Sequence, residues 1–359
     1  MNQTVDYLVV GKGLAGSILA MKLLESNCKI HVIDNPAGTS SSKVSAGIFN
    51  PITGKRFVKT WLADEIFNDL LDYYQNLENK FEVKLLHNNQ IIRPIESIKD
   101  QNHLIAFCAQ KENEKYIEFL NESNEVSVSI NDTKFGLLGT KIGGWVNVNL
   151  LLASINNYLI KQSIYKSQIF DYEQIEFKDN VVIYGGIQYK KIIFCEGYNT
   201  INNPYFNWLP FNAVKGEVLT IEANIPLANF IILKGIFIVP LGNRKFRVGA
   251  TYNWEDKTTE ITDAGKNELI KKLEKLIGPN FKIVNQTAGI RPATIDRRPF
   301  LGLHPKHKSL AILNGLGTKG VSLAPYFVNE MVSFLEKNKT LNPEININRF
   351  SSLYLEDNF

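Results

Sequence analysis

The sequence has 359 residues, 44% hydrophobic and 21% charged; this predicts a folded globular protein of about two domains and excludes disordered, collagen-like and coiled-coil chains. The net charge of +4 is too small for this length to indicate a nucleic-acid or anionic membrane surface. Cys28, Cys108 and Cys195 lie far apart without a CxxC pair, which argues against a zinc site or disulfide framework and favours a cytoplasmic location.

The first predicted elements are a strand, a glycine turn, a helix and a second strand. Residues 5–10 form a short apolar run that ends at Gly11, and residues 14–24 have apolar side chains three and four positions apart. Residues 28–33 predict the second strand. Charged residues and glycines interrupt this apolar start, so we interpret it as a βαβ unit rather than a signal peptide or membrane helix.

The remaining predicted elements mix helices and short strands, and no internal repeat connects them. Helices are predicted at residues 60–77, 149–160, 262–277 and 323–335. Short apolar runs predict strands within residues 81–97 and at 167–171, 181–184, 191–194 and 310–313. An aromatic-rich stretch at 214–252 predicts an antiparallel sheet with a hairpin turn at Gly242-Asn243.

A G-x-G-x-x-G motif from Gly11 to Gly16 lies between the first strand and the first helix. In this motif the first glycine permits a tight turn, Gly13 lets a pyrophosphate approach the helix N-terminus, and Gly16 permits close packing of the helix. Asp34 ends the next strand about twenty residues later, where its carboxylate can accept hydrogen bonds from ribose hydroxyls. The motif therefore predicts a dinucleotide site, and a glycine turn without a ligand is the alternative.

The region after Asp34 favours FAD over NAD as the dinucleotide. A nicotinamide domain would continue with further βα units over a block of about 150 residues, but here a polar loop leads into residues 44–51. A second glycine loop, Gly315-Leu316-Gly317-Thr318-Lys319-Gly320, lies between a strand and a helix near the C-terminus. Two loops so far apart in the sequence suit a long cofactor, with the pyrophosphate on one and the isoalloxazine ring reached by the other.

These patterns predict an α/β fold with a Rossmann-like FAD-binding domain that is discontinuous in sequence, and a second domain built on an antiparallel β-sheet. Nucleotide-domain patterns at both ends of the chain flank β-rich interior stretches. We assign residues 1–85, 142–200 and 285–359 to the FAD-binding domain. Residues 86–141 and 201–284 are assigned to the substrate domain.

Seven blocks of sequence, in order, resemble the FAD-dependent oxidoreductases typified by D-amino-acid oxidase, glycine oxidase and sarcosine oxidase. They are the N-terminal glycine motif with its acidic partner, Ser45-Ala46-Gly47, Gly144-Trp145-Val146-Asn147, Val214-Lys215-Gly216-Glu217, Val248-Gly249-Ala250-Thr251-Tyr252, the segment Gly289 to Asp296 with Pro299, and the second glycine loop running to Ala324-Pro325. Within the family, the sequence looks most like the flavin domain of the bifunctional enzyme that finishes 5-methylaminomethyl-2-thiouridine in tRNA. That enzyme also carries a methyltransferase domain, for which this chain is too short, so a tRNA role is not favoured.

The resemblance implies non-covalent FAD, because the second glycine loop has no cysteine. Backbone N–H groups from Gly317 to Gly320 would face the pyrimidine edge of the flavin. The residues expected to bind the cofactor are Gly11, Gly13, Leu14, Ala15, Gly16, Asp34, Asn35, Ser45, Ala46, Gly47, Gly197, Gly289, Arg291, Gly315, Gly317, Thr318, Lys319 and Gly320. No metal site is expected.

Arg291 is the leading candidate for a substrate-binding residue. The chain has only eight arginines beside thirty-two lysines, so an arginine suggests a need for the planar, bidentate fork. Arg291 also stands where the family's substrate-carboxylate arginine matches; a structural ion pair, for example with Asp296, is the alternative. Tyr252 could hold substrate and Lys234, expected in the preceding strand, could assist oxygen. Core packing and solvation are the alternatives for these two residues.

The predicted function is oxidation of the C–N bond of an amino acid or secondary amine bearing a carboxylate, by hydride transfer to flavin N5. Electrons would then pass to oxygen or to another acceptor, as in a flavin dehydrogenase. A second hypothesis is FAD-dependent modification of tRNA, for which Lys55, Arg56 and Lys59 form a small candidate phosphate-binding cluster. A flavoprotein without enzymatic activity is a third. No membrane partner is expected, and the sequence predicts no oligomeric state.

Overall fold

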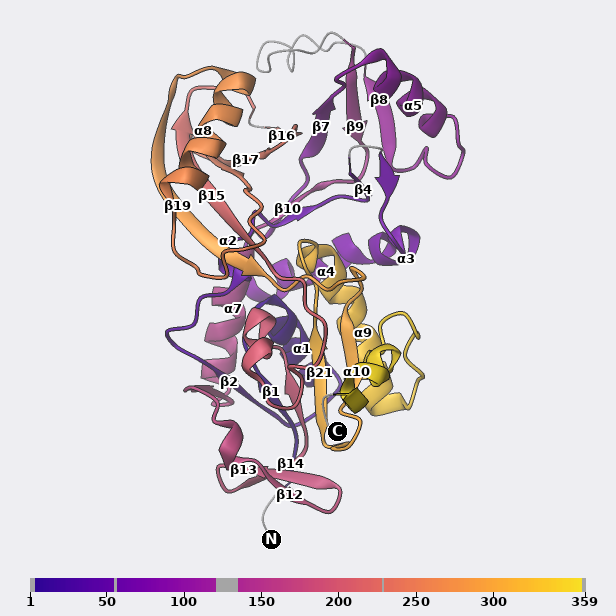
Figure 1. The fold of residues 1–359 in the computed structure, drawn as a ribbon, viewed down its shortest axis with the longest axis vertical. Helices are drawn as coiled ribbons and strands as arrows, with labels where there is room; N and C mark the ends of the chain where they lie inside the picture. Colours follow the sequence, from indigo (N-terminus) through magenta and orange to yellow (C-terminus); the bar gives the residue numbers. More distant parts are fainter. Residues whose placement is uncertain (1–3, 55–56, 121–134, 228, 357–359) are drawn as a thin grey trace. The chain divides into compact units, whose positions relative to one another are not determined.

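The structure is a computed structural model that describes residues 4–54, 57–120, 135–227 and 229–356 (Figure 1). The chain folds into two compact units, each built from separate stretches of sequence. The first unit comprises Met1–Lys43, Val148–Val214 and Ile290–Phe359, and the second comprises Val44–Asn147 and Lys215–Gly289.

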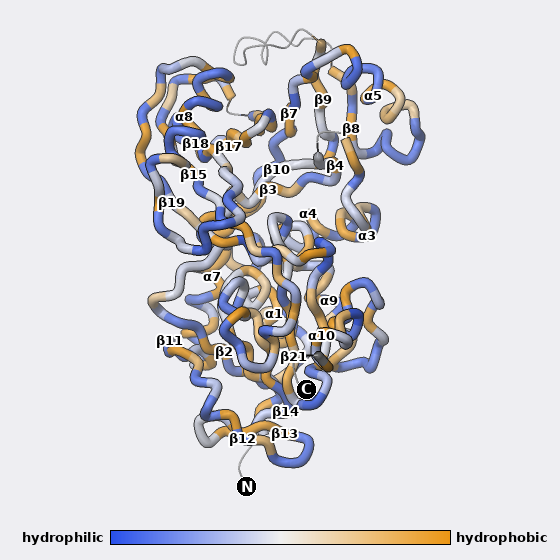
Figure 2. The backbone as a smooth tube through the Cα atoms, in the orientation of Figure 1, coloured by the Kyte–Doolittle hydropathy of each residue, from blue (hydrophilic) through white to orange (hydrophobic). Residues whose placement is uncertain are grey.

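The first unit is built on a central parallel sheet whose strands come from distant parts of the sequence. Its parallel strands lie in the order β11 (Tyr165–Ser167), β2 (Ile30–Asp34), β1 (Val5–Val10), β14 (Ile187–Phe194) and β21 (Leu310–Asn314). Leu8, Val9 and Ile192 are fully buried, as expected for strands covered on both faces. Figure 2 shows the hydrophobic residues of this unit concentrated in these strands and in the adjoining helix α1.

Helices and antiparallel strands complete the first unit. Helix α1 (Leu14–Glu25) packs against α9 (Gly320–Lys337) and α7 (Val148–Lys161), so the helices that follow the two glycine loops are neighbours. The antiparallel strands are β12 (Glu176–Lys178), β13 (Val181–Tyr184) and β20 (Phe300–Leu303). The short helices are α2 (Ser41–Val44), η1 (Tyr172–Gln174), η2 (Gly197–Asn202), η3 (Ile347–Phe350) and α10 (Ser351–Glu356).

The second unit is built on an eight-stranded mixed sheet. Its strands lie in the order β19 (Phe281–Arg291), β15 (Val214–Ala223), β18 (Lys245–Gly249), β17 (Phe237–Gly242), β16 (Phe230–Leu233), β7 (Gln90–Pro94), β9 (Leu137–Thr140) and β8 (Ile117–Leu120). Helix α8 (Asp263–Ile277) buries Leu269 and Leu273 against a core with Leu219 and Ile238 on one face of this sheet.

Smaller elements surround this sheet within the second unit. Strand β10 (Gly144–Val146) pairs antiparallel with β3 (Ile48–Phe49) and with β6 (Leu86–His87). Strands β4 (Ile52–Thr53) and β5 (Val58–Lys59) form a two-stranded ribbon. The helices are α3 (Ala63–Asn68), α4 (Leu70–Phe81) and α5 (Ile98–Cys108).

Local patterns in the sequence located most of these elements. The predicted hairpin at Gly242-Asn243 is confirmed, because Asn243 and Arg244 have φ of 50° and 58°, as a two-residue turn between twisted strands requires. The helix predicted over 60–77 is interrupted at Asp69 (φ −111°, ψ 3°) and forms α3 and α4 instead. Strand β11 spans Tyr165–Ser167, so the strand predicted at 167–171 was placed too late in the sequence and shares only Ser167 with it.

The two units differ from the predicted domain limits mainly over residues 44–85. These residues and 142–147 belong to the second unit, where β3 pairs with β10 and β10 pairs with β6. Residues 201–214 belong to the first unit, where Phe206 and Trp208 join the core beneath the parallel sheet. The predicted assignment of FAD and substrate to separate domains stays a prediction.

Thr262→Ala is expected to destabilise the second unit by about 1–2 kcal/mol. Thr262 caps α8 by accepting from the Gly265 N–H at 2.9 Å, and its hydroxyl donates to the buried Glu217 carboxylate at 2.6 Å. Chemical denaturation measures the change in the free energy of unfolding. Asn267→Ala, at an exposed position of the same helix, is the control and should leave that free energy nearly unchanged.

Within the residues that the structure describes, no helix is both long enough and apolar enough to span a membrane.

Candidate active site on two glycine loops

The first glycine loop lies at the carboxyl edge of the parallel sheet of the first unit. The Gly11 N–H donates to the Ile33 carbonyl at 2.8 Å, and the Cys195 N–H donates to the Val10 carbonyl at 2.7 Å, so the loop is held between β2 and β14. Gly11 has φ of +96°, and a Cβ there would lie 2.5 Å from the Cys195 carbonyl oxygen. A Cβ on Gly16 would overlap with the Gly11 carbonyl. The protein's own packing therefore requires glycine at 11 and 16.

Packing does not explain the glycine at position 13. Its backbone is ordinary (φ −69°, ψ −171°), and a Cβ there would meet only the Ser42 Oγ, at 3.4 Å. Gly13 is the N-cap of α1 and no side chain caps that end, although the Leu14 N–H donates to Ser42 Oγ at 3.0 Å. A helix N-terminus with free space beside a glycine fits an anionic group such as a pyrophosphate.

Asp34 and Lys12 complete the edge of this loop. The Lys12 N–H donates to Asp34 Oδ1 at 2.9 Å, which fixes the carboxylate beside the glycine loop. The Lys12 side chain turns away from the loop, donates to Asn156 Oδ1 at 2.5 Å and lies 4.6 Å from the centre of the Tyr165 ring. Burial lowers the pKa of Lys12. Asn35 shapes the following turn by accepting from the Ala37 N–H. The role of Asp34 in binding a ribose stays a prediction.

The second glycine loop connects β21 to the N-terminus of α9. Gly315 and Gly317 both have positive φ, of 77° and 55°, and the Gly317 N–H donates to the Pro292 carbonyl at 3.2 Å. Helix α9 begins at Gly320 and, like α1, has no side-chain cap at its N-terminus. A Cβ on Gly320 would lie 3.4 Å from Leu14 Cδ2, so the two glycine loops lie side by side. The structure thus brings together two helix N-termini from opposite ends of the sequence, and neither N-cap residue supplies a side-chain hydrogen bond.

Asn314 ties the second loop to the end of β14. Its Nδ2 donates to the Gly197 carbonyl at 2.8 Å and to Thr200 Oγ1 at 2.7 Å, and its Oδ1 accepts from the Gly315 N–H at 2.8 Å. Asn314 and Thr200 are buried. The Asn314 amide thereby forms hydrogen bonds with two groups of η2 and with one group of the second glycine loop. One of these partners is Gly197, which is predicted to bind the cofactor.

Most of the chain matches a known family of enzymes. Residues 6–331 match the family model described as DAO, FAD dependent oxidoreductase. The chain belongs to this family. FAD is the cofactor that the family binds, which confirms the prediction of FAD over NAD, and the two loops supply the glycine cradle and helix N-termini that such a dinucleotide requires. Non-covalent attachment stays a prediction.

Individual members of the family are similar to this chain over different lengths. Glycine oxidase of Bacillus subtilis is 33% identical over 138 residues, 37% of each protein. The tRNA 5-methylaminomethyl-2-thiouridine biosynthesis bifunctional protein of Legionella pneumophila is 24% identical over 324 residues, 83% of this chain and 45% of that protein. These alignments span less than half the length of either relative.

Solved structures show the same fold. Glycine oxidase from Geobacillus kaustophilus superposes with a TM-score of 0.80 at 19% identity, over 95% of this chain and 96% of that one. Iminodiacetate oxidase from Chelativorans sp. BNC1 superposes with a TM-score of 0.76 at 17% identity, over 94% and 97% of the two chains. The predicted α/β fold with a Rossmann-like FAD-binding part is therefore confirmed.

In this DAO-family chain, Arg291 directly precedes Pro292, whose carbonyl accepts a hydrogen bond from the second glycine loop. It ends β19, its carbonyl accepts from the Ala293 N–H at 2.8 Å, and the next residue, Pro292, bonds Gly317. The side chain is partly buried. Asp296, the partner considered for a structural ion pair, is bound by Arg349 at 2.8 Å, and Arg349 and the backbone of Arg298 hold its pKa below the usual range despite partial burial.

Lys319 adds a cation to the second glycine loop. Its side chain is partly buried, and burial together with the positive charges of Arg297 and Arg298 lowers its pKa to about 8. Thr318, beside it, is exposed. A cation at an uncapped helix N-terminus increases the positive potential that this loop presents.

Several other predicted site residues belong to the second unit. Ser45, Ala46 and Gly47 lie beside β10, where the Val146 N–H donates to the Gly47 carbonyl at 2.9 Å. Gly289 is buried within β19. Tyr252 is 60% exposed and follows β18. Lys234 lies in the turn after β16 and not within the strand as predicted, because β16 ends at Leu233.

The cluster considered for tRNA binding is only partly described. Lys55 and Arg56 lie outside the described residues. Lys59 forms an ion pair with Asp64 at 2.7 Å, and Lys115 and Tyr116 bind the same carboxylate. The part of this cluster that the structure describes is therefore neutralised by Asp64.

Two charged residues near the predicted blocks were missed by sequence reasoning. Arg247 donates through Nη1 to the Ser45 carbonyl at 2.6 Å, its buried Nε has no partner among the described residues, and burial lowers its pKa. Glu196 follows β14 and accepts from Tyr172 and Asn203. Their partners are distant in sequence, and only the scarcity of arginine could have drawn attention to Arg247.

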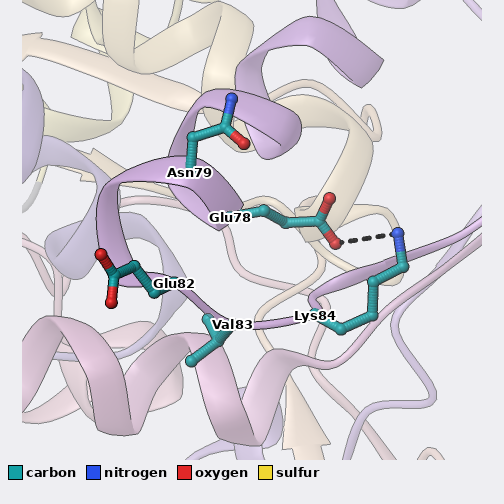
Figure 3. Close-up of a pocket in the computed structure, with 5 residues that line it drawn as sticks. All are labelled: Glu78, Asn79, Glu82, Val83 and Lys84. Carbon is teal, nitrogen blue, oxygen red and sulfur yellow. Dashed lines mark ion pairs between the residues drawn. The ribbon is translucent and has the colours of Figure 1, made fainter.

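A surface hollow lies at the end of α4, in the second unit. It is lined by Glu78, Asn79, Glu82, Val83 and Lys84 (Figure 3). Glu78 pairs with Lys84 at 3.3 Å and accepts from the backbone N–H groups of Leu85 and Leu86 at 2.7 Å. Its carboxylate therefore joins α4 to β6.

Asn314→Ala is expected to weaken FAD binding and to destabilise the first unit by about 2–4 kcal/mol, because three buried polar groups lose their partner. Thermal unfolding of the FAD-free protein measures the stability, and fluorescence titration measures the affinity for FAD. Asn199→Ala, an exposed asparagine in the same η2 segment, serves as the control. An unchanged affinity for FAD in Asn314→Ala would contradict the role given to this side chain.

Proposed function

We propose that this DAO-family protein oxidises the C–N bond of an amino acid or secondary amine that carries a carboxylate. The observation that supports the proposal most is Arg291, which is one residue from the Pro292 carbonyl that holds the second glycine loop. Glycine oxidase and iminodiacetate oxidase, whose names describe oxidation of small carboxylated amines, share the fold.

FAD, when bound, accepts the hydride from the substrate carbon next to nitrogen. The chain's own residues have the task of binding and orienting the substrate. Arg291 would hold the carboxylate through two parallel hydrogen bonds, which fixes which C–H bond points at the flavin. The nitrogen lone pair forms the imine as the C–H bond breaks. Water then adds to the imine carbon. The products are a carbonyl compound together with ammonia from a primary amino acid, or with a primary amine from a secondary amine.

The other assigned residues have supporting roles in the proposal. The N–H groups of Gly317 to Gly320 and the ammonium of Lys319 would stabilise negative charge on the cofactor. Tyr252 would hold substrate and Lys234 would assist the electron acceptor. Oxygen and a different electron acceptor both fit this scheme.

The test is product analysis by mass spectrometry after incubation of FAD-loaded protein with a panel of amino acids and N-carboxymethyl amines. The proposal predicts stoichiometric amine and carbonyl products from at least one carboxylated amine. Amines that lack a carboxylate should give no product. Turnover only of the uncarboxylated amines would contradict it.

A modified nucleoside amine in tRNA is the second candidate substrate. It is supported by the similarity to the tRNA-modifying bifunctional protein over 83% of this chain. The same assay with a carboxymethylaminomethyl-uridine, free and within tRNA, separates the candidates. Turnover of the tRNA form alone would favour the second candidate over a small-molecule amine.

A further inference from the structure

The backbone of Glu196 lies between the segments that anchor the two glycine loops. Glu196 directly follows Cys195 at the end of β14, and its Cα is 3.2 Å from the position that a Cβ on Gly11 would occupy. On its other side, Gly197 begins η2 and offers its carbonyl to Asn314, which precedes the second glycine loop. Glu196 is thus packed on one loop and joined in sequence to the segment that anchors the other.

Both carboxyl oxygens of Glu196 are bound by the protein. Oε1 accepts from the Tyr172 hydroxyl at 2.5 Å and Oε2 accepts from Asn203 Nδ2 at 2.8 Å. Asn203 is buried, and its Oδ1 accepts from the Tyr205 N–H at 2.9 Å, so its amide cannot rotate without losing that bond. The Asn203 N–H also donates to Thr200, which contacts Asn314. A continuous hydrogen-bonded chain therefore runs from Glu196 to Gly315.

The position of a proton on Glu196 follows from these partners. Because Asn203 must donate to Oε2, a proton on the carboxyl resides on Oε1, and the Tyr172 hydroxyl then accepts instead of donating. Among the described residues, no lysine or arginine forms an ion pair with Glu196. The other titratable groups against it are Tyr172 and Cys195, and burial raises the pKa of both, so they stay neutral.

Removal of this carboxyl from water raises the pKa of Glu196 to about 7, although its two hydrogen bonds act in the opposite direction. The folded protein therefore binds this proton more tightly than an unfolded chain does. Ionisation near neutral pH would place a negative charge on the residue that packs against Gly11. We assign that glycine loop to the pyrophosphate of FAD, and like charges repel in a partly buried site.

We propose that Glu196 is a positioning residue whose protonation holds the two glycine loops in the FAD-binding arrangement, so that the affinity for FAD falls as its carboxyl ionises. The inference rests on the assignment of FAD to these loops. It does not depend on which amine is the substrate.

The main experiment measures the dissociation constant of FAD by fluorescence titration of the FAD-free protein as a function of pH. From about pH 6 to about pH 8.5, the wild type should bind FAD roughly tenfold more weakly, as expected when FAD shifts one pKa by about one unit. Glu196→Gln, which stays neutral, should lose this tenfold change and bind more tightly than wild type at high pH. It should keep only the pH dependence that Lys319 contributes, since the pKa of Lys319 is lowered to about 8. Glu173→Gln, an exposed glutamate on η1, should follow the wild type.

Tyr172→Phe gives a directional test that a purely structural role would not pass. The Tyr172 hydroxyl stabilises the ionised carboxylate by donating to it, so its loss should raise the pKa of Glu196 further. The midpoint of the FAD-affinity profile should therefore move to higher pH. Tyr205→Phe, in the same unit, should leave the midpoint in place. A midpoint that stays unchanged in Tyr172→Phe would overturn the assignment to Glu196.

A readout without FAD separates this inference from the proposed function. The free energy of unfolding of the FAD-free wild type should fall relative to Glu196→Gln as pH rises from 4.5, the ordinary pKa of a glutamate, to about 7, because the folded state resists ionisation. FAD that binds with a pH-independent affinity would overturn the inference and leave the proposed function intact. Protein that does not bind FAD at all would instead contradict the site assignment itself.

Discussion

Gly13→Leu is expected to abolish FAD binding while the FAD-free protein stays folded. A Cβ at this position meets only Ser42 Oγ, at 3.4 Å, and the backbone angles suit any residue, so the protein itself tolerates a side chain. The same side chain would occupy the space beside the helix N-terminus that we assign to the pyrophosphate. The dissociation constant should rise at least roughly a hundredfold, or about 3 kcal/mol.

Gly16→Leu is the matched comparison for this substitution. A Cβ on Gly16 overlaps with the Gly11 carbonyl, so this variant should lose thermal stability as well as FAD. Circular dichroism and thermal unfolding distinguish the two outcomes. If Gly13→Leu retains normal affinity for FAD, the first glycine loop is not the pyrophosphate site.

Arg291→Ala is expected to lower kcat/KM for a carboxylated amine by roughly thirtyfold to several thousandfold, or about 2 to 5 kcal/mol of transition-state stabilisation. The loss reflects a charge-assisted, bidentate contact made in a partly buried site. Arg291→Lys should recover only part of the rate, since an ammonium keeps the charge but not the planar fork. Steady-state kinetics with the FAD-loaded variants measures the effect.

The control for Arg291 is the same substrate with its carboxylate changed to an amide. Wild type should discriminate strongly between acid and amide, and Arg291→Lys should discriminate weakly. Arg298 forms an ion pair with Glu344, and Arg298→Lys keeps that positive charge. This control variant should behave as wild type. If wild type and Arg291→Lys treat acid and amide alike, and Arg291→Lys turns over normally, Arg291 is structural and the substrate need not be an amino acid.

The parts of the fold predicted best are those determined by neighbours in sequence. The strand over 5–10 is confirmed because a buried parallel strand is a short apolar run, and the turn at Asn243 is confirmed because the backbone there needs positive φ. The break at Asp69 was not predicted, because the amphipathic pattern continues across it. Residues 44–85 and 142–147 were assigned to the other domain, because the pairings of β3 with β10 and of β10 with β6 join residues about sixty to one hundred positions apart.

The residues of the candidate site also fall into two groups: those that a local sequence motif identifies and those whose partners are distant in sequence. Gly11 to Gly16 and Gly315 to Gly320 were recognised from local motifs, and the structure places the two loops side by side. Glu196 and Arg247 were missed, because their significance depends on burial and on partners such as Ser45, 202 positions from Arg247. A desolvated charge has no signature in a single sequence, since the residues that exclude water from it are scattered along the chain.

Anaerobic titration of FAD-loaded protein with a carboxylated secondary amine, followed by visible absorbance, tests the central claim most directly. The flavin absorbance should bleach in proportion to the amine added, and the corresponding amide should bleach it far more slowly. Arg291→Ala should bind FAD but bleach slowly with both compounds. The claim that this chain oxidises C–N bonds would be contradicted if dithionite reduces the bound flavin but no carboxylated amine bleaches it.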